Sequence, residues 1–435
     1  MAEALIDLGI VATEERRQLP RPPSFPRPVL LLIAVALVGL LTGAAHRPPP
    51  SPPVVVAARL GDMTYVTGDR LFVVSPGKEL LDPIVTTKTV SAYSLPEGRL
   101  LSRTSVDVSG AIFNVLEAGS AILVSYQVDT VGAEATVALV PGTDRELWRR
   151  PARLLAASPA DGLVLLRENS PQFGNLNWYG IDLTTGSVRW SLQQPVRGVT
   201  TEGGVRDGFP RMLVTVTEAG DVEVRDTISG AVIATARVPI EPTRAGADVP
   251  IWLNGDLLMV GAPTGTTAYA LPGLAERWHS DVDLTGRWLQ PACGEAICSL
   301  SWQGGLWVLN ADSGTMRWSD DRWNYADQAG AYLLAADDMG AGRTQRISVL
   351  DPANGRVLGD FGAWHSIGDA AADGSVIGLR ELMTENVVWY ARLDPATQGV
   401  RLLGRAESVA GDCQTTTDVL VCRRIDASVG IWSLK

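Results

Sequence analysis

The residues with the greatest capacity for chemistry are four cysteines, which fall into two local pairs. Cys293 and Cys298 form one pair, and Cys413 and Cys422 form the other. Cysteines placed in this way can form disulfides, bind a metal ion or exchange electrons. Neither spacing matches the Cys-x-x-Cys motif of redox and zinc sites. An even number of cysteines in short loops is typical of disulfides in an exported chain, so the sequence predicts two structural disulfides.

Other catalytic chemistry has few candidates. A hydrolase triad needs a positioned histidine, and the chain has only His46, His279 and His365. The last two each follow a tryptophan directly, and we interpret them as packing or surface residues. The sequence contains no glycine-rich phosphate loop, haem motif or zinc signature. We therefore predict no catalytic residue and no metal site.

A repeat of about forty residues runs through the chain and predicts the strands and turns in which these residues lie. Its core is Asp-x-x-x-Gly, or Asn in place of Asp, followed in the clearest copies by a basic residue and Trp. The Asp side chain can hydrogen-bond the backbone two residues on, and the Gly supplies the positive φ at which the turn ends. These five residues therefore reverse the chain between two strands. The predicted turn residues are Asp182 with Gly186, Asp226 with Gly230, Asn310 with Gly314, and Asp351 with Gly355.

A tryptophan follows several of these turns and falls on the next strand. Its flat side chain is large enough to fill the wedge between two sheets. The interval between Trp190 and Trp278 spans two repeats, so one repeat lacks its tryptophan. We predict that four tryptophans dock one sheet on the next: Trp148, Trp190, Trp278 and Trp318.

Short apolar strands that alternate with turn residues at this period indicate an all-β fold, a β-propeller of four-stranded blades. Eight hairpins are recognisable, and residues 430–434 resemble a ninth first strand with no partner after it. Since a ring must close, we expect residues 54–58 to pair with this last strand and cover its edge. We predict eight blades, with seven or nine as the alternatives.

The unit from Tyr179 to Trp190, with Asp182 and Gly186 at its turn, resembles the tryptophan-docking repeat of the PQQ-like (quinoprotein-type) β-propeller superfamily. Residues 307–318 have the same form, and the resemblance extends over residues 54–435. It implies four-stranded blades around a central channel. The superfamily includes quinoprotein alcohol dehydrogenases, the propeller lipoprotein of outer-membrane protein assembly and many anchored bacterial proteins. The resemblance therefore implies no single activity.

Quinoprotein dehydrogenases of this superfamily carry two adjacent cysteines over the cofactor and bind a calcium ion. No two cysteines are adjacent in this sequence, and the chain lacks the long insertions that build such a pocket. We therefore predict no cofactor. The alternative is a PQQ-dependent oxidoreductase or a cofactor-dependent sensor.

The N-terminal region contains an apolar segment, residues 29–45, of seventeen residues without a charge. This length is at the short limit for a membrane-spanning helix, and we predict a signal anchor. Four arginines lie between residues 16 and 27, and only Arg47 follows closely. The excess of positive charge places residues 1–28 in the cytoplasm, as a disordered tail, and the propeller outside. The proline-rich residues 46–53 are then a stiff spacer. The alternative is a signal peptide that is cleaved after the segment.

Composition and charge limit the classes of partner that the protein can bind. The 435-residue chain is 46% hydrophobic and has 44 glycines and 27 prolines, enough for a large core and many turns. Its net charge of −11 argues against nucleic acid. The longest polar connections, residues 168–177, 201–208 and 241–248, are candidates for a binding face. We predict a non-enzymatic, membrane-anchored scaffold outside the cytoplasm that binds an envelope protein or a small ligand.

Overall fold

The structure is a computed structural model of the 435-residue chain. It describes residues 52–77, 86–128, 132–169, 176–195, 198–205, 208–240, 250–290, 293–301, 304–337, 346–382 and 384–435. Pro49–Lys435 form one compact unit. The predicted tail (1–28), the predicted membrane helix (29–45) and most of the predicted spacer (46–53) lie outside the described residues. Within the described ranges, no helix has the length and apolar character needed to cross a membrane.

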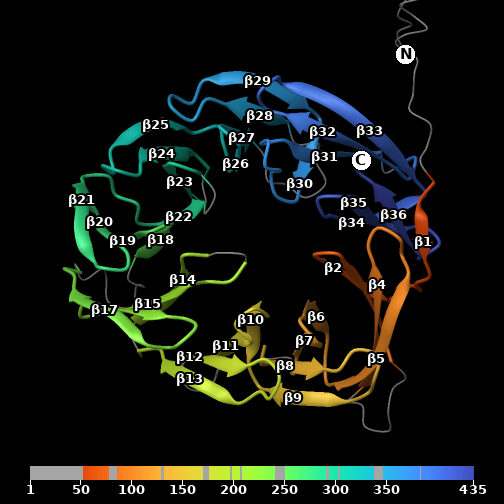
Figure 1. The fold of residues 1–435 in the computed structure, drawn as a ribbon. Coiled ribbons are helices and arrows are strands. Elements are labelled where there is room, and N and C mark those ends of the chain that lie inside the picture. The colour runs from red at the N-terminus through yellow and green to blue at the C-terminus, as the bar shows by residue number, and fades with distance from the viewer. Residues whose placement is uncertain are drawn as a thin grey trace, which may run out of the picture. The chain divides into compact units, whose positions relative to one another are not determined.

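In the described part of the chain, 36 β-strands form nine sheets, or blades, of four antiparallel strands. In eight blades the strands follow one another in chain order, so each of these blades is a meander. Figure 1 shows the first strand of each meander toward the centre of the ring and the fourth strand at its rim.

The first four blades occupy the N-terminal half of the propeller. Blade 1 contains β2 (Met63–Thr67), β3 (Arg70–Ser75), β4 (Thr86–Ser94) and β5 (Leu100–Val108), and blade 2 contains β6 (Ile112–Ala118), β7 (Ala121–Gln127), β8 (Glu134–Leu139) and β9 (Glu146–Arg150). Blade 3 contains β10 (Arg153–Ser158), β11 (Leu163–Asn169), β12 (Leu176–Asp182) and β13 (Val188–Gln193), and blade 4 contains β14 (Gly198–Gly203), β15 (Met212–Thr217), β16 (Asp221–Asp226) and β17 (Val232–Arg237).

The remaining five blades complete the ring. Blade 5 contains β18 (Ile251–Asn254), β19 (Leu257–Ala262), β20 (Gly265–Ala270) and β21 (Ala275–Ser280), and blade 6 contains β22 (Arg287–Gln290), β23 (Ala296–Ser301), β24 (Leu306–Asn310) and β25 (Met316–Asp320). Blade 7 contains β26 (Tyr325–Ala329), β27 (Tyr332–Ala336), β28 (Ile347–Leu350) and β29 (Val357–Gly362). Blade 8 contains β30 (His365–Ile367), β31 (Val376–Leu382), β32 (Val387–Asp394) and β33 (Gly399–Glu407), and blade 9 contains β34 (Val409–Thr415), β35 (Val419–Arg424), β36 (Val429–Ser433) and β1 (Val54–Val56).

The position of a strand in its blade decides its pattern of burial. Middle strands are covered on both faces by the neighbouring blades, and in β7 the first six residues are all buried. Rim strands have more exposed residues. In β13, Trp190 and Leu192 pack toward the next blade, whereas Ser191 and Gln193 are exposed.

The described residues form nine clusters of buried hydrophobic side chains, and each cluster joins two neighbouring blades. One cluster contains Val90 of blade 1 and Val124 of blade 2. Another joins Val421 of blade 9 to Leu71 of blade 1, which closes the ring. The hydrophobic core therefore runs around the ring, from one blade junction to the next.

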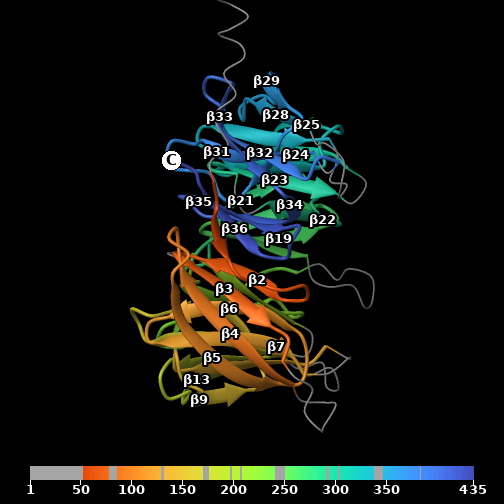
Figure 2. The same ribbon diagram turned by 90° about the vertical axis from the view of Figure 1, so that its right-hand side faces the viewer.

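The ring closes through a strand from the N-terminal end of the propeller. β1 pairs with β36, with Val54 opposite Ile431 and Val56 opposite Val429. This register confirms the predicted pairing of the first and last segments. Figure 2 shows β35 and β36 of this blade beside β2 and β3 of blade 1.

The predicted number of eight blades is wrong, because the described residues form nine. The prediction counted the turns of the repeat, and each of those turns joins the third strand of a blade to the fourth. Blade 9 has no such turn, since its fourth strand comes from the other end of the propeller. The eight hairpins therefore correspond to eight blades, and the last strand, at residues 430–434, belongs to the ninth, which is the alternative number that the sequence left open.

Candidate binding site

The four predicted docking tryptophans all lie on rim strands and contact the turn of the next blade. In each case the indole N–H donates a hydrogen bond to the carbonyl oxygen of the residue after the turn Asp or Asn. The N···O distances are 2.8 Å from Trp148 to Leu183, 2.9 Å from Trp190 to Thr227, 2.7 Å from Trp278 to Ala311 and 3.0 Å from Trp318 to Pro352.

Each turn packs against the indole ring of the tryptophan from the preceding blade. Gly186 has a φ of +66°, and its N–H donates to the Asp182 carbonyl oxygen at 2.9 Å. A Cβ at Gly186 would lie 2.4 Å from Cγ of Trp148, so both the backbone and the packing require glycine. The hydrogen bond from Arg189 is the largest cause that holds the pKa of Asp182 well below its usual range.

The other predicted turn residues repeat this arrangement. The N–H of each turn glycine donates to the carbonyl oxygen of its Asp or Asn at 2.8 Å, in the pairs Gly230 with Asp226, Gly314 with Asn310, and Gly355 with Asp351. These glycines have positive φ and lie against Trp190, Trp278 and Trp318. In the other four meanders the rim position of the tryptophan holds a small residue: Ser102 in blade 1, Ala234 in blade 4, Gly359 in blade 7 and Gly404 in blade 8. Ala234 therefore takes the place of the tryptophan missing from the sequence repeat.

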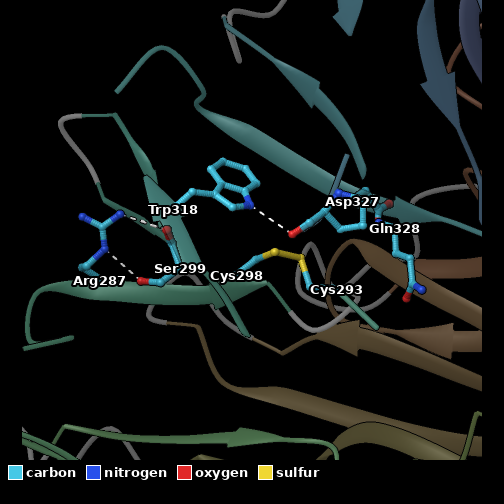
Figure 3. Close-up of a disulfide and its surroundings, with 8 residues drawn as sticks. Arg287, Cys293, Cys298, Ser299, Trp318, Asp327 and Gln328 are labelled. Carbon is cyan, nitrogen blue, oxygen red and sulfur yellow. Dashed lines mark hydrogen bonds between the residues drawn. A yellow bond between two sulfur atoms is a disulfide. The ribbon is translucent and has the colours of Figure 1, made fainter. Parts of the chain in front are cut away.

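Both predicted disulfides are present, and the described residues include no free cysteine. Cys293–Cys298 ties β23 to the residues before it in blade 6, and Cys413–Cys422 ties β34 to β35 in blade 9. Figure 3 shows the first bridge with the docking Trp318 beside it. Because Cys298 and Cys422 are fully buried, both bridges form part of the junction cores.

Several titratable side chains on the inner strands have shifted pKa values. Burial raises the pKa of Asp327, which accepts a hydrogen bond from the Tyr325 hydroxyl at 3.1 Å. Burial also raises the pKa of Glu202, although two arginines of blade 3 oppose the shift. Burial lowers the pKa of His365. These groups belong to three blades, and the described residues contain no group of three or more His, Cys, Asp or Glu that could hold a metal ion.

A groove of about 650 Å³ lies between blades 3 and 4. One wall is the rim strand β13, at residues 191–193. The other wall is the face of blade 4, which β15, β16 and β17 provide. Most of the side chains on this second wall carry a hydroxyl or a charge, including Thr215, Asp221, Glu223, Arg225, Thr235 and Arg237.

The second wall is polar because blade 4 departs from the pattern of the repeat. In every meander, the residue before the turn between the third and fourth strands faces the preceding blade. This residue is apolar or aromatic and buried in seven meanders: Tyr93, Leu139, Ile181, Tyr269, Leu309, Leu350 and Leu393. In blade 4 it is Arg225, which is only partly buried. A charged side chain therefore replaces the apolar side chain that packs into the junction elsewhere.

Charges of both signs line the groove. The Arg225 side chain forms an ion pair with Glu223 (Nε–Oε1 2.5 Å) and donates through Nη1 to the Gly230 carbonyl oxygen at 2.8 Å. Asp221 and Arg237 are cross-strand neighbours and are exposed. The groove can therefore bind a polar ligand that offers both donors and acceptors.

Sequence reasoning missed this groove, although a signal was available. The copy of the repeat in residues 222–230 has Arg225 directly before the turn Asp, where the other clear copies have Ile181, Leu309 and Leu350. The connections predicted to carry the binding site, residues 168–177, 201–208 and 241–248, fall wholly or in part outside the described residues. Among these copies of the repeat, the one in blade 4 has a charged residue before the turn, and this marks the junction that differs.

Comparisons with known proteins indicate the fold. No protein-family model matches the chain, and a search of curated proteins finds no match. A crystal structure of a eukaryotic initiation factor is similar, with a TM-score of 0.50 and 10% identity over 82% of this chain and 90% of that chain. BamB from Moraxella catarrhalis matches with a TM-score of 0.42 and 16% identity, over 88% of this chain and 99% of that chain. Because 1086 chains of solved structures match, the likeness belongs to a widespread fold and indicates no activity.

Proposed function

We propose that this protein is a non-enzymatic scaffold of the PQQ-like propeller type, anchored by residues 29–45 with the propeller outside the cytoplasm. In this proposal it binds another envelope protein in the groove between blades 3 and 4. The groove carries the proposal, because Arg225 occupies a position where seven other meanders have a buried apolar or aromatic residue. A buried Leu or Ile would add about 1.5–3 kcal/mol of stability at such a position. A residue that departs from the packing pattern of its fold, as Arg225 does, is expected at a functional site.

The construction of the junction suits a binding role. Trp190 fixes the two walls of the groove to each other, since its indole N–H donates to Thr227 of blade 4 at 2.9 Å. The walls consist of regular strands, which fix the backbone positions, and the ion pair with Glu223 holds the Arg225 side chain before a partner arrives. A preformed site loses little conformational freedom on binding. The propeller can therefore act as a rigid platform for a partner.

Two features support a location in the cell envelope. The excess of arginine before residues 29–45 favours an N-terminus inside and a propeller outside. The two disulfides suit an oxidising compartment, where such bridges form and persist.

The test is site-specific photo-crosslinking in cells. A photoreactive phenylalanine at Thr235, which lies in the groove, should give a discrete adduct with one envelope protein. The control is a photoreactive phenylalanine at Asp360, the equivalent exposed position on the rim strand of blade 7. It should give no adduct, because Asp360 does not line the groove. Arg225→Leu should abolish the adduct from Thr235. Equal adducts from both positions would contradict a specific site.

A second measurement addresses the enzymatic alternative. Pyrroloquinoline quinone with calcium should neither bind saturably to the purified protein nor change its thermal melting. Saturable binding, which at a hundredfold excess over Kd would add about 2.7 kcal/mol of stability, would overturn the scaffold in favour of an oxidoreductase or a cofactor-dependent sensor.

A further inference from the structure

We infer that the groove between blades 3 and 4 binds an extended polypeptide segment that pairs with β13 as a fifth strand of blade 3. This inference rests on the proposed scaffold function and specifies the kind of partner. The bound segment would carry polar side chains of both charge signs at alternate positions, and these would face the wall of blade 4.

The first observation is the direction of the backbone groups in β13. Among the described residues, β13 is the last strand of its sheet, so one of its edges pairs with no strand. The N–H of Gln194 donates to the Leu176 carbonyl oxygen of β12 at 2.8 Å, which places Leu192 on the paired side. Backbone groups alternate along a strand, so those of Ser191 and Gln193 point to the open edge. Both residues line the groove.

The second observation is the spacing of the charges on the opposite wall. Asp221, Glu223 and Arg225 are alternate residues of β16, and all three line the groove. Alternate side chains of an extended strand are about 7 Å apart. A peptide that runs along β13 presents its own alternate side chains at the same interval. Each side chain that faces blade 4 can therefore meet one charged residue of β16.

The third observation distinguishes this rim strand from the others. Each meander has an open rim edge, but in the junctions where the residue before the turn is buried and apolar, that residue packs against the preceding blade. Only blade 4 carries a charged residue at this position among the eight meanders of the described chain. The polar wall and the open edge occur together at this junction. Edge pairing supplies main-chain hydrogen bonds, and the wall supplies side-chain selectivity.

The experiment uses the full-length protein in detergent micelles and a display library of random dodecapeptides. Selected peptides, measured by fluorescence polarisation, should carry charged residues two positions apart. Gln193→Pro removes a donor only from the open edge, and Pro151 already stands at the equivalent place three residues after Trp148. Arg225→Leu restores the apolar residue of the other blades. Both variants should bind the selected peptides at least tenfold more weakly. Gln193→Pro should melt close to the wild-type temperature, and Arg225→Leu should melt at that temperature or above it, because it adds a buried apolar side chain.

A matched control and a scan of the peptide complete the design. Glu407→Pro places the same change at the equivalent rim position of blade 8 and should leave binding unchanged. N-methylation of the peptide backbone should abolish binding at alternate residues only, as strand pairing requires. Failure to select any peptide, or selected peptides that bind the Gln193→Pro variant as tightly as the wild type, would overturn the inference. In either case a crosslink from Thr235 that depends on Arg225 would still uphold the scaffold, so the two proposals fail separately.

Discussion

The contact between Trp148 and Gly186 offers the sharpest test of how the blades are held together. Replacing Gly186 by alanine has two costs. The residue has a φ of +66°, where a Cβ costs about 1–2 kcal/mol. The new Cβ would also lie 2.4 Å from Cγ of Trp148, and overpacking of this kind costs about 1–3 kcal/mol. We expect Gly186→Ala to lower the free energy of unfolding by about 2–5 kcal/mol in total.

A double-mutant cycle separates the two costs. Trp148→Ala should lower stability by about 3–5 kcal/mol, because it removes a buried indole and leaves a cavity. In that background the methyl group introduced by Gly186→Ala no longer meets a ring, so this substitution should cost only the conformational share of about 1–2 kcal/mol. The coupling energy between the two positions should therefore be about 1–3 kcal/mol.

Gly255 provides the matched control, because it has a φ of +57° and a Cβ there would meet no atom within 4 Å. Gly255→Ala should cost the conformational share alone, in both backgrounds. The assay is equilibrium unfolding in urea followed by circular dichroism, which does not depend on the tryptophan signal. Equal costs for Gly186→Ala with and without Trp148 would show that the ring of Trp148 does not lie on this glycine, and the docking argument would be refuted.

The remaining predictions concern the other junctions, the cysteines, the pH dependence and the membrane. Trp190→Ala should cost about 3–5 kcal/mol, and Trp432→Ala should in addition speed amide hydrogen exchange in β1; unchanged melting would place either ring outside a junction. No thiol should react with an alkylating reagent until the protein is denatured and reduced, and four reactive thiols without reductant would refute the bridges. Burial lowers the pKa of His365 below 6.5, so the folded protein should lose stability as the pH falls from about 6.5 toward that lower pKa; His365→Asn should flatten this part of the stability curve, and an identical curve would contradict the assignment. Protease added to intact cells should reach the propeller but not an N-terminal tag, and a protected propeller would reverse the proposed topology.

The repeat contained most of the information about the local structure. Asp182 and Gly186 are turn residues because the side chain of one and the positive φ of the other are properties of those residue types. Trp148 lies at a junction because a large flat ring on a rim strand has a wedge to fill. The closing pair of Val54 and Ile431 followed from the need to cover an exposed edge. The inferences about the turns and the tryptophan each depend on one residue type and one short-range constraint, whereas the closing pair depends on the rule that an exposed sheet edge is covered.

The number of blades was harder to predict, because it depends on a blade without the motif. β34 and β35 carry no turn of the repeat, and β1 lies more than 350 residues before its partner in the chain. The alternation of apolar residues shows that such strands exist but does not show which sheet they join. Only the pairing register reveals that they form a ninth sheet.

Arg225 shows why the candidate site also required the structure. In the sequence it is one arginine among many, beside a turn that otherwise follows the repeat. Its meaning depends on which way the residue before the turn points, and only the junction clusters show that this residue faces the preceding blade. A polar side chain there contributes little to holding two blades together. Blades 3 and 4 remain joined through the hydrogen bond from Trp190 to Thr227 and through a buried cluster that includes Leu192 and Leu213. The docking tryptophan and this cluster thus keep the geometry of the junction although the residue before the turn is charged. A propeller that repeats one docking contact can therefore vary the rest of a junction, and it is at such a junction that a binding groove can form.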